Sequence, residues 1–135
     1  MIRIQSEQIK LKKQYYITRL NGVLKQLKLT GIVTVKLGDE EESRELNNTY
    51  RKKDYPTDVL SFPLNEKLPG GFYIGDIFIC HPIAVKQAEE NGVSIEEELL
   101  TLMVHGILHL AGYDHEEDDG EMLDLQDTLL DAIEM

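Results

Sequence analysis

The feature that most constrains this chain is an apolar stretch, residues 95–111, that runs into a cluster of histidines. Its apolar residues lie on nearly every side of a helix, which predicts a helix buried at the centre of the fold. Ser94 and Glu97 form a capping box that begins this helix. Apart from Glu96 and Glu97 in its first turn, its polar residues share one stripe: Glu98, Thr101, His105 and His109.

Three of the four histidines lie in the eleven-residue sequence HGILHLAGYDH, residues 105–115. His105 and His109 are four positions apart, so both imidazoles project from one face of a helix. Gly112 follows where a helix commonly ends in a left-handed residue, and such a turn brings His115 back toward the other two. Three converging neutral imidazoles predict a transition-metal site, with zinc as the expected ion and a fourth position for water or substrate.

The nearest peptidase pattern, HExxHxxGxxH, shares the three histidines and the glycine. This chain has Gly106 at the position of the peptidase glutamate, which serves as general base. Zinc still lowers the pKa of its bound water to about 7, so hydrolysis in general is retained. The missing base argues against a peptidase and favours hydrolysis of another substrate. Asp114 has two open roles, orienting an imidazole or capping the turn.

The bulk properties fit one ordinary globular domain over residues 1–135. Hydrophobic residues make up 41% of the chain and charged residues 29%. The single cysteine, Cys80, excludes an internal disulfide and a cysteine-based zinc knuckle. No apolar run approaches the roughly 20 residues that a membrane span requires, and no signal peptide is recognised. We expect a cytosolic enzyme or binding domain with no membrane partner.

The net charge of −11 is unevenly distributed. Residues 1–28 hold seven basic residues and one acidic residue, whereas residues 55–135 hold two basic and eighteen acidic residues. A polyanion would therefore be attracted to the N-terminal helix and to residues 51–53, not to the whole molecule. The alternative, that these lysines are only the solvated face of an amphipathic helix, stays open.

Residue patterns predict a mixed succession of strands and helices. An antiparallel hairpin is expected from strands 59–62 and 73–80 around a loop at 65–71, with Asp76 at an unusual place within the second apolar strand. The predicted strands are 2–5, 30–37, 59–62 and 73–80, and the predicted helices are 7–28, 39–50, 82–90, 95–111 and 122–133. Asn21-Gly22 is expected to kink or divide the first helix.

Arg51 is a second candidate for chemistry. It follows a predicted helix and precedes the turn that Pro56 enforces. A guanidinium placed there can stabilise charge on a phosphoryl group in transfer. Pairing with one of the neighbouring acidic residues is an equally good interpretation from spacing alone.

Together, the motifs HGILHLAGYDH, RKKDYPTDVLSFP and GDIFI resemble those of the YbeY family of metal-dependent endoribonucleases, in the same order along the whole chain. The resemblance implies an α+β, zincin-like fold: a mixed sheet of about four strands, packed with helices and holding a central metal-binding helix. It implies one zinc ion bound by His105, His109 and His115, and links Arg51 to RNA cleavage. Ser61 and Asp76 are expected to have structural or supporting roles.

The implied function is a zinc-dependent, single-strand-specific endoribonuclease in ribosomal RNA processing and ribosome quality control, including maturation of the 3′ end of 16S rRNA. Its implied partners are RNA and the small ribosomal subunit or its proteins; the sequence does not predict an oligomeric state. Two alternatives remain: a metal-dependent hydrolase of a peptide or small molecule, and a non-enzymatic assembly factor with structural zinc. Three ligands argue against the latter, because structural zinc sites normally have four.

Overall fold

The computed structural model describes residues 1–6, 9–113 and 121–134. Four strands form one mixed sheet in the order β1-β2-β4-β3, with β3 antiparallel to β4 and the other neighbours parallel. The strands are β1 (Ile2–Gln5), β2 (Ile32–Gly38), β3 (Val59–Leu68) and β4 (Gly71–Cys80). The helices are α1 (Lys13–Gln26), α2 (Glu40–Arg51), α3 (His81–Asn91), α4 (Ile95–Leu110) and α5 (Glu121–Glu134). The predicted α+β class and four-stranded mixed sheet are confirmed.

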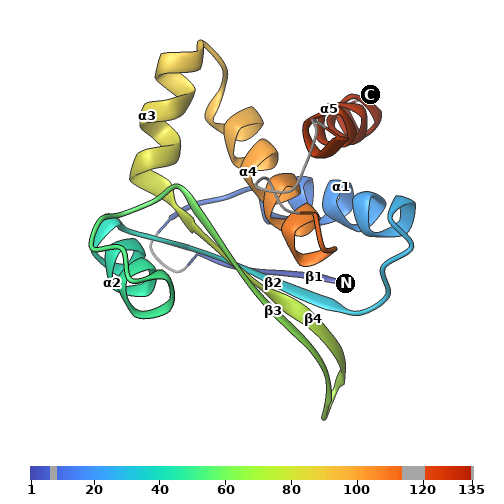
Figure 1. Ribbon diagram of the computed structural model, residues 1–135. Helices are drawn as coiled ribbons and strands as arrows, with labels where there is room; N and C mark the ends of the chain where they lie inside the picture. Colours follow the sequence, from blue (N-terminus) through green and yellow to red (C-terminus); the bar gives the residue numbers. More distant parts are fainter. Residues whose placement is uncertain (7–8, 114–120, 135) are drawn as a thin grey trace.

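The helices divide between the two faces of the sheet, with α1, α4 and α5 on one side and α2 on the other (Figure 1). Successive strand residues point to opposite faces. Ile77 and Ile79 of β4 join the main core beneath α4, whereas Phe78 and Cys80 join a smaller cluster against which Leu46 of α2 packs. This two-sided burial explains why β4 is nearly continuously apolar.

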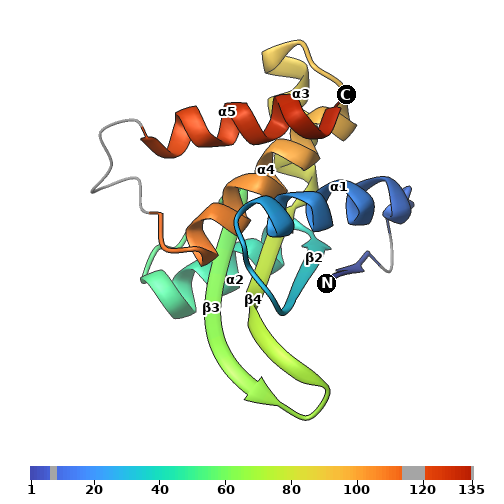
Figure 2. The same ribbon diagram turned by 90° about the vertical axis from the view of Figure 1, so that its right-hand side faces the viewer.

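Helix α4 is the centre of the main core, as its all-round apolar pattern predicts. It crosses between the sheet and α5, with α1 beside it (Figure 2). Gly106 is buried, and six side chains of this helix are completely buried: Leu99, Leu100, Met103, Val104, Ile107 and Leu108. The predicted cap is also present, since Ser94 Oγ accepts a hydrogen bond of 3.1 Å from the Glu97 amide.

The first helix is shorter and more regular than predicted. It begins at Lys13, not Glu7, and the predicted kink or division at Asn21-Gly22 is wrong because both residues lie within one continuous helix. Leu20 and Val23, on either side of this pair, are completely buried. Their burial outweighs the cost of a glycine in a helix interior, about 0.5–1 kcal/mol.

The β3–β4 hairpin is longer than predicted and projects beyond the helices (Figures 1 and 2). Most of the predicted loop 65–71 is strand, and only Pro69 and Gly70 form the turn. The register shifts between Pro63 and Glu66, where Asn65 has a φ of 50°. Such a bulge lets an edge strand accommodate a proline, which cannot donate a ladder hydrogen bond.

Asp76 lies on the exposed part of β4, opposite Phe62 of β3. Partial desolvation of its carboxyl group raises its pKa. The carboxylate is thus not a buried charge, so its place in an apolar strand does not carry the cost of burying an unpaired charge. Separately, no helix among the described residues is long and apolar enough to span a bilayer.

Helix α4 packs closely on the sheet at Gly106. A Cβ atom at this position would lie 2.9 Å from Cδ1 and Cγ2 of Ile77. We expect Gly106→Ala to lower the free energy of unfolding by about 1–2 kcal/mol, because an overpacking cost of about 1–3 kcal/mol exceeds the gain in helix propensity. Urea denaturation of the variant measures this loss.

The matched control is the same substitution in an Ile77→Ala background. Removing the atoms that the new Cβ meets should make Gly106→Ala neutral or stabilising there. An equal loss of stability in both backgrounds would contradict the close contact as its cause.

Candidate metal centre and active site

Two of the predicted metal ligands converge on the exposed side of α4. The His105 and His109 rings meet edge to face with centroids 4.6 Å apart, and their Nε2 atoms are 3.0 Å apart. Two nitrogens that share a tetrahedral zinc, each at about 2.0–2.1 Å, lie about 3.3 Å apart. The two histidines therefore already have nearly the spacing that a shared metal ion requires.

The third predicted ligand, His115, lies outside the described residues, as does Asp114. Within residues 1–6, 9–113 and 121–134, no three His, Cys, Asp or Glu side chains are grouped to hold a metal. The turn that precedes His115 is described: α4 ends at Leu110, and Gly112 has a φ of +100°. The predicted helix-ending glycine with a positive φ is therefore present at Gly112, whereas the return of His115 toward the other two histidines lies outside the described residues.

A side chain from α5 fixes the ring of His105. Its Nδ1 is 2.9 Å from Oε1 of Gln126, whose side chain is only 8% exposed. An amide oxygen can only accept, so the proton of His105 belongs on Nδ1 and the lone pair on Nε2. Metal-binding histidines are usually oriented in the same way, by a hydrogen bond from the ring nitrogen that does not bind the metal. Nothing in the local sequence pattern around Gln126 indicated this contact.

The histidines open into a hollow of about 740 Å³ at the edge of the sheet. Residues 57–63 at the start of β3 form one wall, and Gly112 and Tyr113 another. Tyr50 and Arg51, at the end of α2, complete the lining. The structure thus brings the predicted candidate Arg51 into the same hollow as His105 and His109.

Arg51 is exposed and makes no ion pair with any described residue. The neighbouring Asp54 is instead paired with Arg44, at 2.9 Å from Nε to Oδ1. Spacing alone left two equally good interpretations of Arg51, pairing with a neighbouring acidic residue or binding an anion. The described geometry favours the second, because the guanidinium is available to an anion. Arg51 is the last residue of α2, and Lys52 ends the helix in a left-handed conformation with a φ of 57°.

Two buried polar side chains of α2 hold the loop that follows Arg51. Ser43 Oγ donates to the Thr57 carbonyl at 2.7 Å and accepts from the Thr57 amide at 2.9 Å. Asn47 Nδ2 donates to the Tyr55 carbonyl at 2.8 Å. Both side chains are completely buried, so these bonds fix the end of α2 relative to β3. Neither residue was predicted from the sequence.

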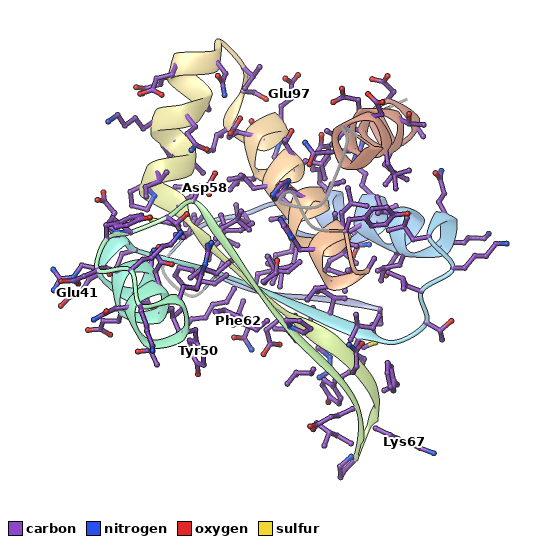
Figure 3. The ribbon with its side chains drawn as sticks, viewed as in Figure 1. Glu41, Tyr50, Asp58, Phe62, Lys67 and Glu97 are labelled. Atoms are coloured by element: carbon purple, nitrogen blue, oxygen red, sulfur yellow. The ribbon has the colours of Figure 1, made fainter. Side chains whose placement is uncertain are left out.

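Asp58 and Ser61 connect the start of β3 to its neighbours. Asp58, which lies where β3 begins (Figure 3), accepts from the Val59 amide at 2.8 Å and from Gln87 of α3 at 3.3 Å. Ser61 Oγ donates to the carbonyl of Gly106, between the two histidines, at 3.2 Å. Ser61 thereby has the structural role expected for it.

The fourth histidine is separate from this site. His81 opens α3 and lines a different hollow, of about 490 Å³, with Lys36 and Asp39. Burial lowers the pKa of His81, which favours the neutral ring. It contributes nothing to the lining around His105 and His109.

Comparisons with known proteins agree with this architecture. The model of a protein family described as Endoribonuclease YbeY matches residues 1–134. A protein named Endoribonuclease YbeY from Sulfurihydrogenibium sp. is 47% identical over 116 residues, which cover 82% of this chain and 76% of that protein. One of the same name from Persephonella marina is 42% identical over 127 residues, covering 90% and 83% of the two chains.

A solved structure extends the likeness to the fold. The solution structure of TM1509 from Thermotoga maritima has a TM-score of 0.69 and 37% identity, and the match covers 98% of this chain and 89% of that one. The family match spans the histidine motif, Arg51 and the β3–β4 hairpin together. The chain therefore belongs to the YbeY family.

Proposed function

We propose that this chain is a zinc-dependent endoribonuclease that cuts single-stranded ribosomal RNA, including the 3′ end of 16S rRNA, in ribosome maturation and quality control. The observation that carries the proposal is that His105, His109 and Arg51 line the same hollow, with the two histidine Nε2 atoms 3.0 Å apart. Relatives named Endoribonuclease YbeY support the reaction and the RNA substrate. We further propose that residues 1–135 act as one domain in the cytoplasm. The proposed partners are the small ribosomal subunit or its proteins.

The proposed ligands are His105, His109 and His115, holding one zinc ion per chain. The chemistry of the donors fits, since imidazole is a preferred zinc ligand and the two described nitrogens have nearly the required spacing. Zinc bound there supplies Lewis acidity and lowers the pKa of water toward about 7. Gln126 keeps the His105 lone pair directed at this position, and Arg51 binds and neutralises the phosphate.

The packing of Gly106 weakens the peptidase alternative. The position that bears the peptidase base faces Ile77 in the core, where even a Cβ atom would lie within 2.9 Å. A glutamate there would not reach the hollow without displacing α4 from the sheet. The charge that assists phosphate cleavage has to come from elsewhere, and Arg51 is the cation that lines the hollow.

Replacing Arg51 with alanine should abolish most RNA cleavage and leave the metal in place. Losing one group that stabilises transition-state charge costs about 100- to 1,000-fold in rate. The measurement is the single-turnover cleavage rate of a single-stranded RNA, together with the zinc content of the purified variant.

Arg44→Ala is the matched control, because Arg44 lies on the same helix and is paired with Asp54. It should cleave at the wild-type rate. Arg51→Ala cleaving as fast as Arg44→Ala would exclude the role proposed for Arg51.

Replacing Gln126 with leucine should weaken zinc binding about 10- to 100-fold, the usual effect of removing the partner that orients a metal-binding histidine. Competition with a chelating dye measures the affinity of the metal-free protein. Thr128→Ala on the same helix is the control, since Thr128 is exposed and its hydroxyl donates to the Asp124 carbonyl. Wild-type affinity in Gln126→Leu would show that the His105 contact does not prepare the site.

A further inference from the structure

Tyr50 is a large aromatic residue that is exposed to solvent beside the candidate active site. It lies on the face of α2 that carries the buried Asn47 and the half-buried Leu46, yet 65% of Tyr50 is exposed. Its ring meets that of Phe62 on β3 at a centroid distance of 5.0 Å and an angle of 61°. Figure 3 shows the two side chains together between α2 and β3. This edge contact leaves much of the Tyr50 ring available to a further partner.

The two rings belong to the same hollow as Arg51 and the histidines. A substrate whose phosphate is bound by Arg51 therefore has adjacent parts within reach of Tyr50 and Phe62. The hollow, about 740 Å³, falls in the range of small-molecule sites, about 300–1,000 Å³. There is room for the nucleoside next to the cleaved phosphodiester.

The charge around Tyr50 suits a nucleic acid. Arg51, Lys52 and Lys53 follow it directly and are all exposed, in a chain whose net charge is −11. Basic side chains that follow the phosphates, next to aromatic rings that stack on bases, are the usual means of binding single-stranded nucleic acids. An acidic protein partner would match the cations alone and would leave the exposed ring unexplained.

We propose that Tyr50, supported by Phe62, stacks on one unpaired nucleobase of the RNA whose phosphodiester Arg51 binds. This inference rests on the proposed function and adds a base subsite to it. In a duplex each base is already stacked and paired, so a subsite that needs a free base face selects single-stranded RNA. Stacking does not read base edges, so the subsite discriminates weakly among the four bases.

The test compares Tyr50→Ala and Tyr50→Phe on a short single-stranded RNA and on the same RNA carrying one abasic nucleotide, scanned through the positions around the cleavage site. Wild type should lose about 5- to 150-fold in kcat/KM at one abasic position, since stacking is worth about 1–3 kcal/mol and about 1.4 kcal/mol is tenfold. On intact RNA, Tyr50→Ala should show the same loss in kcat/KM. The abasic nucleotide at that position should cause no further loss in this variant. Tyr50→Phe keeps the ring and should resemble wild type.

Tyr55→Ala is the matched control, because Tyr55 is 54% exposed in the following loop but does not line the hollow. It should cleave both RNAs as wild type does. A Tyr50→Ala variant with wild-type kcat/KM on naked RNA would overturn the subsite and assign the patch to a protein partner. A Tyr50→Phe variant as impaired as Tyr50→Ala would also overturn it, because the hydroxyl would then be the active group.

Failure of the proposed function has a different signature. Zinc-loaded wild type that leaves every single-stranded RNA intact would refute the nuclease activity and the subsite that depends on it. Cleavage by wild type, with no abasic position affecting the rate, would refute the subsite alone. Circular dichroism melting of each variant verifies that the exposed substitutions leave the fold intact.

Discussion

The close approach of α4 to β4 at Gly106 is the contact on which the rest of the structure depends. It seats apolar side chains of α4 in the core, whereas His105 and His109 stay partly accessible and line the hollow. The same approach puts the Gly106 carbonyl within reach of Ser61 on β3. One glycine thus sets the distance between the histidines and the strand that forms the opposite wall of the site.

The site lies at an edge because only there do the two faces of the sheet meet. β3 has β4 as its neighbour on one side, and its successive residues point to opposite faces. Ser61 contacts α4 on one face, whereas Phe62 contacts Tyr50 of α2 on the other. Helices that the sheet keeps apart elsewhere therefore contribute to a single hollow: the histidines from α4 and the cation and aromatic ring from α2.

The features that could be predicted from the sequence are those that depend on local spacing. The histidine pair on a buried helix, the turn at Gly112 and the positions of the four strands follow from periodicity and turn chemistry, whereas the mixed sheet was implied by the family resemblance. Gln126 could not be predicted, because its contact joins residues 21 apart and a buried glutamine has no local signal. The continuity of α1 through Gly22 was mispredicted for a related reason: long-range burial overrode a local helix breaker.

The most direct test of the account is a zinc titration of metal-free protein, with cleavage of single-stranded RNA followed at each addition. We expect a rate that rises with added zinc and saturates at one ion per chain, with a duplex of the same sequence left uncut. Replacing His109 with alanine should remove both the zinc binding and the cleavage while the fold persists. Cleavage at the full rate by metal-free protein would contradict the account.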